Sequence, residues 1–214
     1  GAIIVTDAVS VADAAKIRAL SALDADPTYS LIDTAANLAA AGDVGTDAVN
    51  IEVTDAATFA QGATILAFGA TTLVMDISQA DIANHANNTA NAATNVTITG
   101  ALTHAEAATV LANTNSGTTT LASVTGTSAE LAALTVGDAT ITAVTGSDAA
   151  TADEITTILG FTTPSAYSLT DSVANLVALP SSTLNGATNL VSSGEATVAQ
   201  ATVLDAATNS GTTT

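Results

Sequence analysis

The sequence predicts an α/β fold: a right-handed α/β solenoid of about nine strand-turn-helix repeats with one parallel sheet. The first observation is that residues 114–120, Thr-Asn-Ser-Gly-Thr-Thr-Thr, return unchanged at 208–214, 94 positions later. The second is an echo of residues 29–38 at 167–176, an offset of 138. Both offsets are multiples of a period of 46 to 47 residues, which lies in the range of repeat proteins. The third is a series of helix-start signals at half that period.

Helix starts are predicted where Ser or Thr precedes a polar acceptor by three residues, because the two residues can then cap each other's backbone N–H groups. This pattern occurs five times, at Ser10 with Asp13, Thr58 with Gln61, Thr103 with Glu106, Thr151 with Glu154 and Thr197 with Gln200. A second series of caps lies between these, at Thr34, Ser78, Thr127 and Ser172. The nine caps are 20 to 25 residues apart, so the repeat is about 23 residues long.

Small or aliphatic residues follow the first series of caps at positions +4 and +7, which predicts one buried face for each helix. The +4 residues are Ala14, Gly62, Ala107, Ile155 and Ala201, and the +7 residues are Ile17, Ile65, Val110, Ile158 and Leu204. In the second series the +4 residues are Leu38, Ile82, Leu131 and Leu176. Small residues at +4 allow short helices to pack side by side at the strand spacing of ~4.8 Å.

Short segments rich in β-branched residues lie before most caps and predict strands. They cover residues 3–5, 29–31, 50–53, 71–75, 95–98, 140–144, 167–169 and 189–191. Each then runs into an Asp or Gly suited to a tight turn, as at Asp7, Asp33, Asp55, Asp76, Gly100, Gly126, Asp171 and Gly194. Strands joined through helices lie parallel, and such crossovers are right-handed. The alternative architecture is an all-β helix with alanine-rich turns, in which the five caps would be accidental.

The repeats form one predicted domain, residues 1–214, with repeats that start near residues 3, 28, 49, 71, 94, 118, 140, 166 and 188. Solenoids need polar caps at both ends. Neither the apolar opening Ile3-Ile4-Val5 nor the closing Thr212-Thr213-Thr214 reads as a cap. We therefore expect an internal segment of a longer repeat protein, or a protomer that stacks end to end.

Composition restricts the possible partners. The chain is 48% hydrophobic but 2% aromatic, so its core is predicted to be aliphatic, and it has no cysteine for a disulfide or thiolate metal site. Lys16 and Arg18 are the only basic residues against 20 acidic ones, which leaves a net charge of −18. This charge opposes binding to nucleic acid or anionic lipid. No apolar run reaches the ~20 residues of a membrane span, so no membrane insertion is predicted.

Several stretches resemble the repeats of very large secreted bacterial surface proteins of the adhesin-like kind. They are the Tyr-Ser-Leu-x-Asp-[Thr/Ser]-x-Ala-Asn-Leu stretches at 29–38 and 167–176, and residues 197–204 with the tail 209–214. The resemblance covers most of the chain and implies an extracellular or cell-surface location and a structural or adhesive role. It implies no calcium requirement, because the Gly-Gly-x-Gly-x-Asp nonapeptides of calcium-binding rolls are missing.

No catalytic residue, cofactor or enzyme activity is predicted, since no GxGxxG, GxxxxGK[ST], GxSxG or HExxH motif occurs. His85 and His104 occupy different series of the repeat, which does not support a shared metal site. In the one acidic doublet, Asp153-Glu154, Glu154 is already assigned to a helix cap. Asn87 and Asn95 begin glycosylation sequons, which arise by chance in a chain rich in Asn and Thr.

The turn aspartates are the one candidate metal site. Asp7, Asp33, Asp55 and Asp171 recur where strand meets helix, and carboxylates at one edge of a solenoid could hold calcium. Gly takes the place of Asp in other turns, so an ordinary turn role is the favoured interpretation.

Two classes of function follow from this architecture. The favoured one is a structural repeat module of an extracellular bacterial surface protein or filament, which supplies length and stiffness and has further copies or flanking repeats as its end-to-end partners. The alternative is a binding or adhesion module for a ligand, a glycan or ice, which would use the sheet face or the Thr rows. These rows are Thr97/Thr99, Thr118/Thr120, Thr140/Thr142 and Thr212/Thr214.

Overall fold

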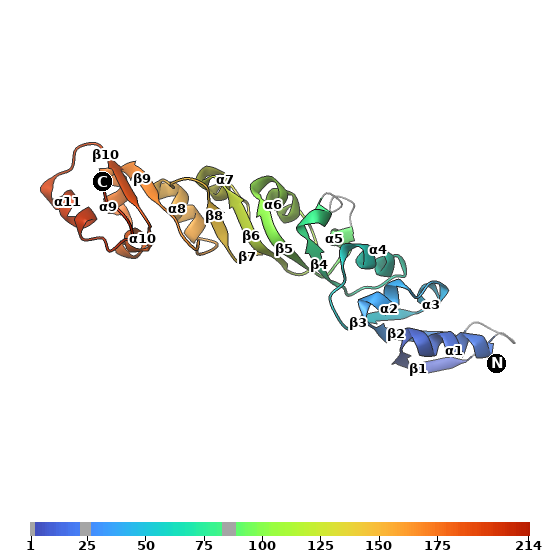
Figure 1. Ribbon diagram of the computed structural model, residues 1–214. Helices are drawn as coiled ribbons and strands as arrows, with labels where there is room; N and C mark the ends of the chain where they lie inside the picture. Colours follow the sequence, from blue (N-terminus) through green and yellow to red (C-terminus); the bar gives the residue numbers. More distant parts are fainter. Residues whose placement is uncertain (1–2, 22–26, 83–88) are drawn as a thin grey trace. The chain divides into compact units, whose positions relative to one another are not determined.

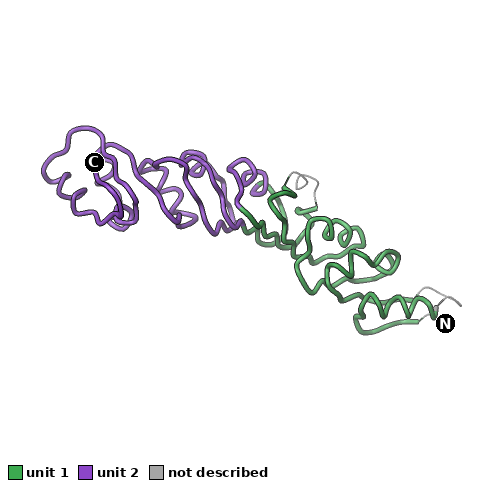
Figure 2. The backbone as a smooth tube through the Cα atoms, in the orientation of Figure 1, with its two compact units in different colours: residues 1–100, 112–120 green, residues 101–111, 121–214 purple. Residues whose placement is uncertain are grey.

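The computed structural model describes residues 3–21, 27–82 and 89–214, in which parallel strands alternate with short helices (Figure 1). The predicted α/β class with parallel strands is therefore confirmed. The helices also exclude the all-β alternative. The chain divides into two compact units (Figure 2). Unit 1 holds Gly1–Gly100 and Ala112–Thr120, and unit 2 holds Ala101–Leu111 and Leu121–Thr214.

Unit 1 begins with a three-stranded sheet of order β1-β2-β3. Its elements are β1 (Ile4–Val9), α1 (Val11–Ser21), β2 (Thr28–Asp33), α2 (Ala35–Ala39), α3 (Asp43–Thr46) and β3 (Asn50–Val53). There follow α4 (Phe59–Ala67), β4 (Val74–Ser78), α5 (Thr89–Ala92) and most of β5 (Asn95–Thr103). In β4 and β5 the buried Met75 and Ile77 lie beside the buried Val96 and Ile98.

Unit 2 continues the alternation. It contains α6 (His104–Leu111), most of β6 (Thr119–Gly126), α7 (Ser128–Ala132), β7 (Thr140–Ile141), β8 (Val144–Gly146) and α8 (Ala152–Leu159). The last elements are β9 (Leu169–Ser172), α9 (Val173–Ala178), α10 (Ser181–Gly186), β10 (Leu190–Ser193) and α11 (Val198–Asp205). Val124 of β6 lies beside Val144 of β8, and Leu169 of β9 beside Leu190 of β10, so aliphatic side chains stack from strand to strand.

The core is aliphatic, as the composition predicts. Helix positions +4 and +7 from the caps supply much of it, with Ala14, Leu38, Ile65, Ala107, Val110, Leu131, Ile155 and Leu176 at most 1% exposed. Two positions depart from this pattern, because Ile17 is half-buried and Ala201 is exposed. Both lie in the first or last repeat, where only one side of the helix is covered by a described neighbour.

The helix caps form at the predicted places. Each of the nine Ser or Thr residues directly precedes a helix, although the one after Ser78 is a single 3-10 turn at 79–82. Reciprocal side-chain-to-backbone bonds form at Thr58, Thr103, Thr151 and Thr197. Ser10 differs, because the shorter Asp13 accepts from the Ser10 hydroxyl (2.9 Å) instead of the backbone N–H. Thr127 with Glu130 adds a further reciprocal cap.

The prediction of one continuous sheet is wrong, because the strands form three sheets. Their orders are β1-β2-β3, β4-β5-β6-β7 with β8 also beside β6, and β10-β9. The ladder stops where β3 and β8 run into the equivalent turns Thr54-Asp55-Ala56 and Ser147-Asp148-Ala149. After each turn only one residue rejoins the next strand, Ala57 beside Met75 and Ala150 beside Leu169. The predicted strand 140–144 is likewise divided into β7 and β8.

None of the helices in the described ranges is long and apolar enough to cross a membrane.

Candidate functional site

Polar side chains of the turns link each repeat to the one before it. Asp33 ends β2, and its Oδ2 accepts a hydrogen bond from the N–H of Val11 (3.0 Å), the first residue of α1. Its Oδ1 accepts from the Thr34 N–H (2.8 Å) and from the Asn37 side chain (2.7 Å), both in the next helix start. One carboxylate therefore caps its own helix and the helix of the preceding repeat. We call this arrangement an aspartate link.

The same link recurs in unit 2, 138 residues later. Asp171 Oδ2 accepts from the N–H of Ala152 (3.0 Å), the first residue of α8. Its Oδ1 accepts from the Ser172 N–H (2.7 Å) and the Asn175 side chain (2.9 Å). The echo of 29–38 at 167–176 therefore preserves a three-bond contact as well as a strand.

The aspartate links hold the carboxylates in their charged form. For Asp171 the Ala152 N–H makes the largest contribution to a lowered pKa, followed by the Asn175 side chain and the Ser172 N–H. For Asp33 the Asn37 side chain contributes most to a lowered pKa, burial opposes it, and the Val11 and Thr34 amides lower the pKa further. Helix N-termini stabilise negative charge, so the charge and the helix ends stabilise each other.

Two simpler aspartate links lie at the sheet breaks. Asp55 Oδ1 accepts from the N–H of Ala35 (2.6 Å), which opens α2, and Asp148 Oδ1 accepts from the N–H of Ser128 (2.6 Å), which opens α7. Here too the carboxylate reaches back one repeat. The chain can therefore leave the sheet for a turn while the helices of neighbouring repeats stay tied together.

The structure places the four predicted calcium aspartates separately. Asp33, Asp55 and Asp171 use carboxylate oxygens on helix N–H groups. The turn predicted at Asp7 is wrong, because β1 continues to Val9 and Asp7 lies exposed within the strand. Within the described residues no group of three or more His, Asp or Glu side chains could share a metal ion. Sequence reasoning missed Asp148, although the match between Thr54-Asp55-Ala56-Ala57-Thr58 and Ser147-Asp148-Ala149-Ala150-Thr151 is a signal that could have found it.

A second kind of link, which we call the asparagine link, uses the seven-residue repeat. Asn95 Oδ1 accepts from the N–H (2.9 Å) and hydroxyl (3.2 Å) of Thr118, one repeat further on. In the reverse direction Asn115 Nδ2 donates to the Thr94 carbonyl (3.1 Å). Asn91 adds a bond from the Thr114 N–H (2.9 Å). The segment 114–118 is thus held by side chains that lie 23 residues earlier.

The asparagine link also returns, 94 residues later. Asn189 Oδ1 accepts from the N–H (3.0 Å) and hydroxyl (3.1 Å) of Thr212, and Asn209 Nδ2 donates to the Thr188 carbonyl (3.2 Å). Asn185 accepts from the Thr208 N–H (2.9 Å). The anchor sequence Asn-x-Ala-Thr-Asn at 91–95 and 185–189 is therefore the partner of Thr-Asn-Ser-Gly-Thr-Thr-Thr.

Glycine is needed inside this link. A Cβ atom on Gly117 would lie 2.6 Å from the Thr94 carbonyl oxygen and would meet Asn95 Oδ1 more closely still. A Cβ on Gly211 would meet the Thr188 carbonyl oxygen and Asn189 Oδ1 in the same way.

The two tyrosines occupy matching places 138 residues apart. The Tyr29 hydroxyl donates to the Val44 carbonyl (2.8 Å), and the Tyr167 hydroxyl donates to the Thr183 carbonyl (2.7 Å). Burial is the main reason that the pKa of each hydroxyl is raised. Each tyrosine ties a strand start to the short helix that precedes the next strand.

The remaining residues singled out in the sequence either belong to helix starts and links of the fold or lie outside the described residues. Glu154 Oε2 accepts from the Thr151 N–H (2.8 Å), so the acidic doublet serves a helix start. His104 is the half-buried first residue of α6, and Asn95 belongs to an asparagine link. His85 and Asn87 lie outside the described residues.

The hydroxyls of the Thr rows are partly used by the fold. Thr99 Oγ1 donates to the Ile77 carbonyl (3.4 Å), and the Thr118 and Thr212 hydroxyls donate to asparagine links. Such hydroxyls are less available to a ligand on the sheet face.

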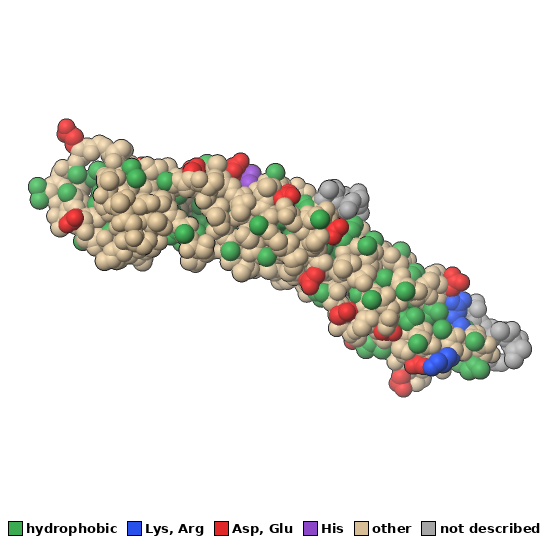
Figure 3. Space-filling view, viewed as in Figure 1, with side chains coloured by type: hydrophobic (Ala, Val, Ile, Leu, Met, Phe, Trp, Pro, Cys, Tyr) green, Lys and Arg blue, Asp and Glu red, His purple; other side chains and the backbone are tan. Residues whose placement is uncertain are grey.

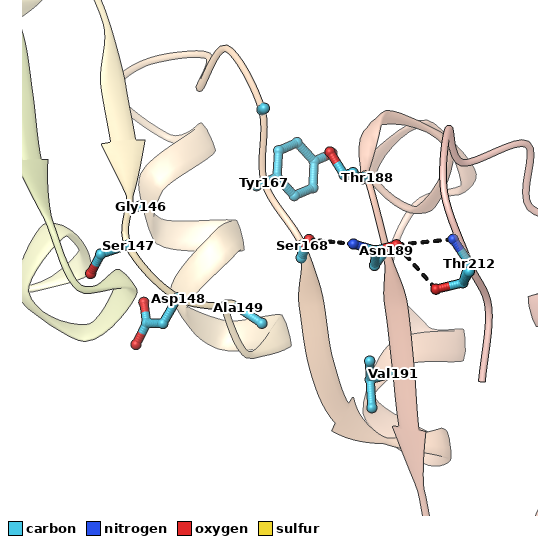
Figure 4. A pocket seen from close by; sticks show the side chains of 11 residues that line it. Gly146, Ser147, Asp148, Ala149, Tyr167, Ser168, Thr188, Asn189, Val191 and Thr212 are labelled. Atoms are coloured by element: carbon cyan, nitrogen blue, oxygen red, sulfur yellow. Dashed lines mark hydrogen bonds between the residues drawn. The ribbon is translucent and has the colours of Figure 1, made fainter.

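A cleft of about 580 Å³ opens in unit 2 where β8 and β9 separate (Figure 4). Three of its lining residues have their main polar atoms already engaged: Asn189 with Thr212, Asp148 with Ser128, and Tyr167 with Thr183. Figure 4 shows Asn189 bonded on one side to Ser168 (3.4 Å) and on the other to Thr212. The cleft walls are thus built from the links themselves.

Comparison with known protein families, with characterised proteins and with solved structures finds no match for this chain. The arguments about function therefore rest on the contacts described above.

Proposed function

We propose that this chain is a structural repeat module of an extracellular bacterial surface protein or filament. In this proposal the strand-helix repeats wind as a right-handed α/β solenoid and stack end to end with further repeats or copies, which provides length and stiffness. The observation that carries the proposal is the recurrence of whole hydrogen-bond sets: the Asp33 set at Asp171 and the Asn95 set at Asn189.

This recurrence supports a structural role because the recurring hydrogen bonds join neighbouring repeats. In a stack each repeat contacts only its neighbours, so its stability depends on the repeat-to-repeat interface. The aspartate and asparagine links both cross that interface. The Asp and Asn side chains of these links are the ones that would be expected to bind a ligand or metal in a recognition module, and here they form hydrogen bonds within the fold.

Winding as a solenoid is supported by the parallel strands and by the general right-handedness of strand-helix-strand crossovers. The turns at Asp55 and Asp148 do not end this path. Ala57 and Ala150 each rejoin the next strand through two backbone bonds of 2.8 or 2.9 Å. Each of these turns therefore interrupts the hydrogen-bonded ladder, but the repeats on its two sides remain paired through one residue.

The proposed location is the cell surface or the medium around it. The resemblance to secreted surface proteins supports it, and a net charge of −18 with no cysteine suits a chain that must stay soluble without disulfides. The same charge opposes nucleic acid as a partner.

A binding module is the second candidate, and the cleft beside Tyr167 is the observation in its favour. The Ser147 and Thr188 side chains line it and have no hydrogen bond to another described residue. A binding function predicts a ligand whose affinity falls when Ser147→Ala and Thr188→Ala are combined.

The structural proposal is tested by sedimentation velocity over a range of concentrations. We expect the 214-residue chain to associate as its concentration rises. The same chain with a polar helical cap fused to each end should sediment as a monomer, because the caps cover the end repeats. A clean monomer for the uncapped chain at the highest concentration would contradict the proposal.

A further inference from the structure

The cleft beside Tyr167 has a counterpart in unit 1 that is held together differently. The offset of 94 residues that relates the two asparagine links also relates Thr188 to Thr94 and Tyr167 to Leu73. The backbone contact of the two pairs is the same, because the Thr94 N–H donates to the Leu73 carbonyl (2.8 Å) and the Thr188 N–H to the Tyr167 carbonyl (2.6 Å). The two places can therefore be compared bond by bond.

One side-chain hydrogen bond of unit 1 has no equivalent in unit 2. In unit 1 the Thr94 hydroxyl oxygen accepts from the Leu73 N–H (3.2 Å). In unit 2 neither the Tyr167 N–H nor the Thr188 hydroxyl has a hydrogen-bond partner among the described residues. Both residues line the cleft. A donor and a hydroxyl that satisfy each other in unit 1 are therefore open to a ligand in unit 2.

The turn after β8 adds two further free polar groups to the cleft. The exposed Ser147 hydroxyl has no partner within the described ranges, and Asp148 uses only its Oδ1, on the Ser128 N–H (2.6 Å). Figure 4 shows Ser147 and Asp148 across the gap from Tyr167. The Tyr167 ring and the exposed Val191 also line the cleft, so hydrogen-bonding groups and apolar surface lie together there.

The charge of unit 2 disfavours an anionic ligand. Lys16 and Arg18, the only basic residues of the chain, belong to unit 1, and Figure 3 shows them over the first repeat. Every formally charged side chain of unit 2 is therefore an Asp or Glu, and the negative potential that results repels phosphate, sulfate and carboxylate groups. An ammonium group does not fit either, because it has no lone pair to accept from the Tyr167 N–H.

A neutral hydroxyl group suits the cleft because it both donates and accepts hydrogen bonds. It can accept from the Tyr167 N–H and donate to Thr188 Oγ1 or to the free Oδ2 of Asp148. Saccharides carry several such groups on a compact frame whose C–H surface packs against aromatic rings. The cleft volume of about 580 Å³ lies within the ~300–1,000 Å³ of small-molecule sites.

We propose that the cleft between β8 and β9 binds a neutral saccharide. The Tyr167 N–H and the Thr188 and Ser147 hydroxyls bind hydroxyl groups of the sugar, Asp148 Oδ2 accepts from a further one, and the Tyr167 ring packs against the sugar's C–H surface. The inference rests on the binding function named above as the second candidate and gives it a ligand class. It is independent of end-to-end association.

The test is isothermal titration calorimetry of the 214-residue chain with maltose, cellobiose, lactose and N-acetylglucosamine as probes. We expect at least one of these sugars to bind. Thr188→Val and Ser147→Ala should each weaken its binding about tenfold, because each variant removes one hydrogen bond to the ligand. Ser210→Ala is the matched control, since Ser210 is exposed and lies outside the cleft lining. It should leave binding unchanged.

Thr94→Val tests the comparison between the two units. It removes the hydrogen bond to Leu73, so it should lower the urea midpoint and leave saccharide binding unchanged. Thr188→Val should do the reverse, with an unchanged urea midpoint and weakened binding. Such a result would also show that the binding loss does not come from unfolding.

Three results would overturn the inference. Binding of spermidine or glucuronate in place of the neutral sugars would contradict the ligand class and leave a binding function standing. Sugar binding that is indifferent to both Thr188→Val and Ser147→Ala would contradict the site. No binding of any of the four sugars would contradict the inference as a whole and leave the structural proposal, which sedimentation tests, unaffected.

Discussion

Aspartate side chains in this chain accept hydrogen bonds from helix N–H groups that have no main-chain partner within their own helix. The first N–H groups of any helix have no partner within that helix. A short helix therefore has a large share of unsatisfied donors. Val11, Ala35, Ser128 and Ala152 are such donors, and each is satisfied by an Asp of the following repeat. The hydrogen bonds that satisfy these helix N–H groups therefore also connect neighbouring repeats.

The two asparagine links should contribute about equally to stability. Asn95→Ala removes the acceptor for two donors of Thr118, so we expect a loss of about 1–2 kcal/mol in unfolding free energy. Asn189→Ala should cost about the same, because both asparagines are half-buried and both threonine partners are exposed. Urea titrations of both variants test this. Clearly unequal losses would show that the two links are not equivalent.

Gly117 should tolerate no side chain. Gly117→Ala forces a methyl group against the Thr94 carbonyl and Asn95 Oδ1, so we expect destabilisation of about 1–3 kcal/mol, as for overpacking in a core. Ser116→Ala, at the exposed neighbouring residue, is the control and should be nearly neutral. A thermal melt of each variant measures the difference. If the two variants melt together, the link is looser than described.

At the scale of the residue, the sequence predicted the positions of the turn aspartates better than it predicted their hydrogen-bond partners. Asp33, Asp55 and Asp171 were located at turns, and their turn role was favoured. Their bonds to a helix one repeat earlier could not be predicted, because a contact 19 to 22 residues away depends on how the repeats stack. The hydroxyl bonds of Tyr29 and Tyr167 were missed for the same reason.

Helices as short as five residues, such as α2 and α7, are too short to be stable alone. Their caps define where they begin, and burial of Leu38 or Leu131 holds them against the sheet. Capping depends on residues three positions apart, so it is readable from sequence. This is why the helix starts were predicted well and the course of the strands was not.

Acid should weaken the helix-to-helix connections. The pKa of Asp33 and Asp171 is lower in the folded chain than the unfolded value of about 3.9. Their stabilisation is therefore complete above that pH and is lost as the pH falls through the lower folded-state pKa. We expect a urea midpoint that is level from about pH 7 to 5 and falls below about pH 4.

The variant Asp33→Asn/Asp171→Asn tests the source of this acid sensitivity. It should have a lower urea midpoint at neutral pH and a shallower fall in acid than the unchanged chain. Asp138→Asn serves as the control, since Asp138 is an exposed loop residue, and it should keep the full fall. An unaltered acid response in the double variant would show that other carboxylates are responsible.

Calcium should not be needed to hold the repeats together. The oxygens that would bind it at Asp33, Asp55 and Asp171 accept N–H groups instead. Thermal melts with excess calcium and with a chelator should superimpose, because a ligand that binds only the folded state would raise the melting temperature. A large drop on chelation would show that the turn aspartates bind metal.

At the scale of the whole molecule, the period was predictable and the continuity of the sheet was not. The described strands other than β8, which begins at residue 144, begin at residues 4, 28, 50, 74, 95, 119, 140, 169 and 190, close to the predicted repeat starts. The sheet breaks lie in the turns after β3 and β8, where continued backbone pairing competes with a hydrogen bond of the Asp side chain. There Asp55 and Asp148 accept from the first N–H of the preceding repeat's helix, and the backbone leaves the ladder until Ala57 and Ala150. The strand propensity of the sequence does not predict which of these two contacts forms.

The central claim is that side-chain links lock each repeat to its neighbour, and native-state amide hydrogen exchange tests it most directly. The N–H groups of Ala35 and Ala152 have no partner in their own helices, and they donate to Asp55 and Asp171 of the following repeat. Ala36 and Asp153, the next residues in the same helices, provide the internal reference. We expect slow exchange at Ala35 and Ala152 and fast exchange at the reference residues. Equally fast exchange at all four would contradict the account.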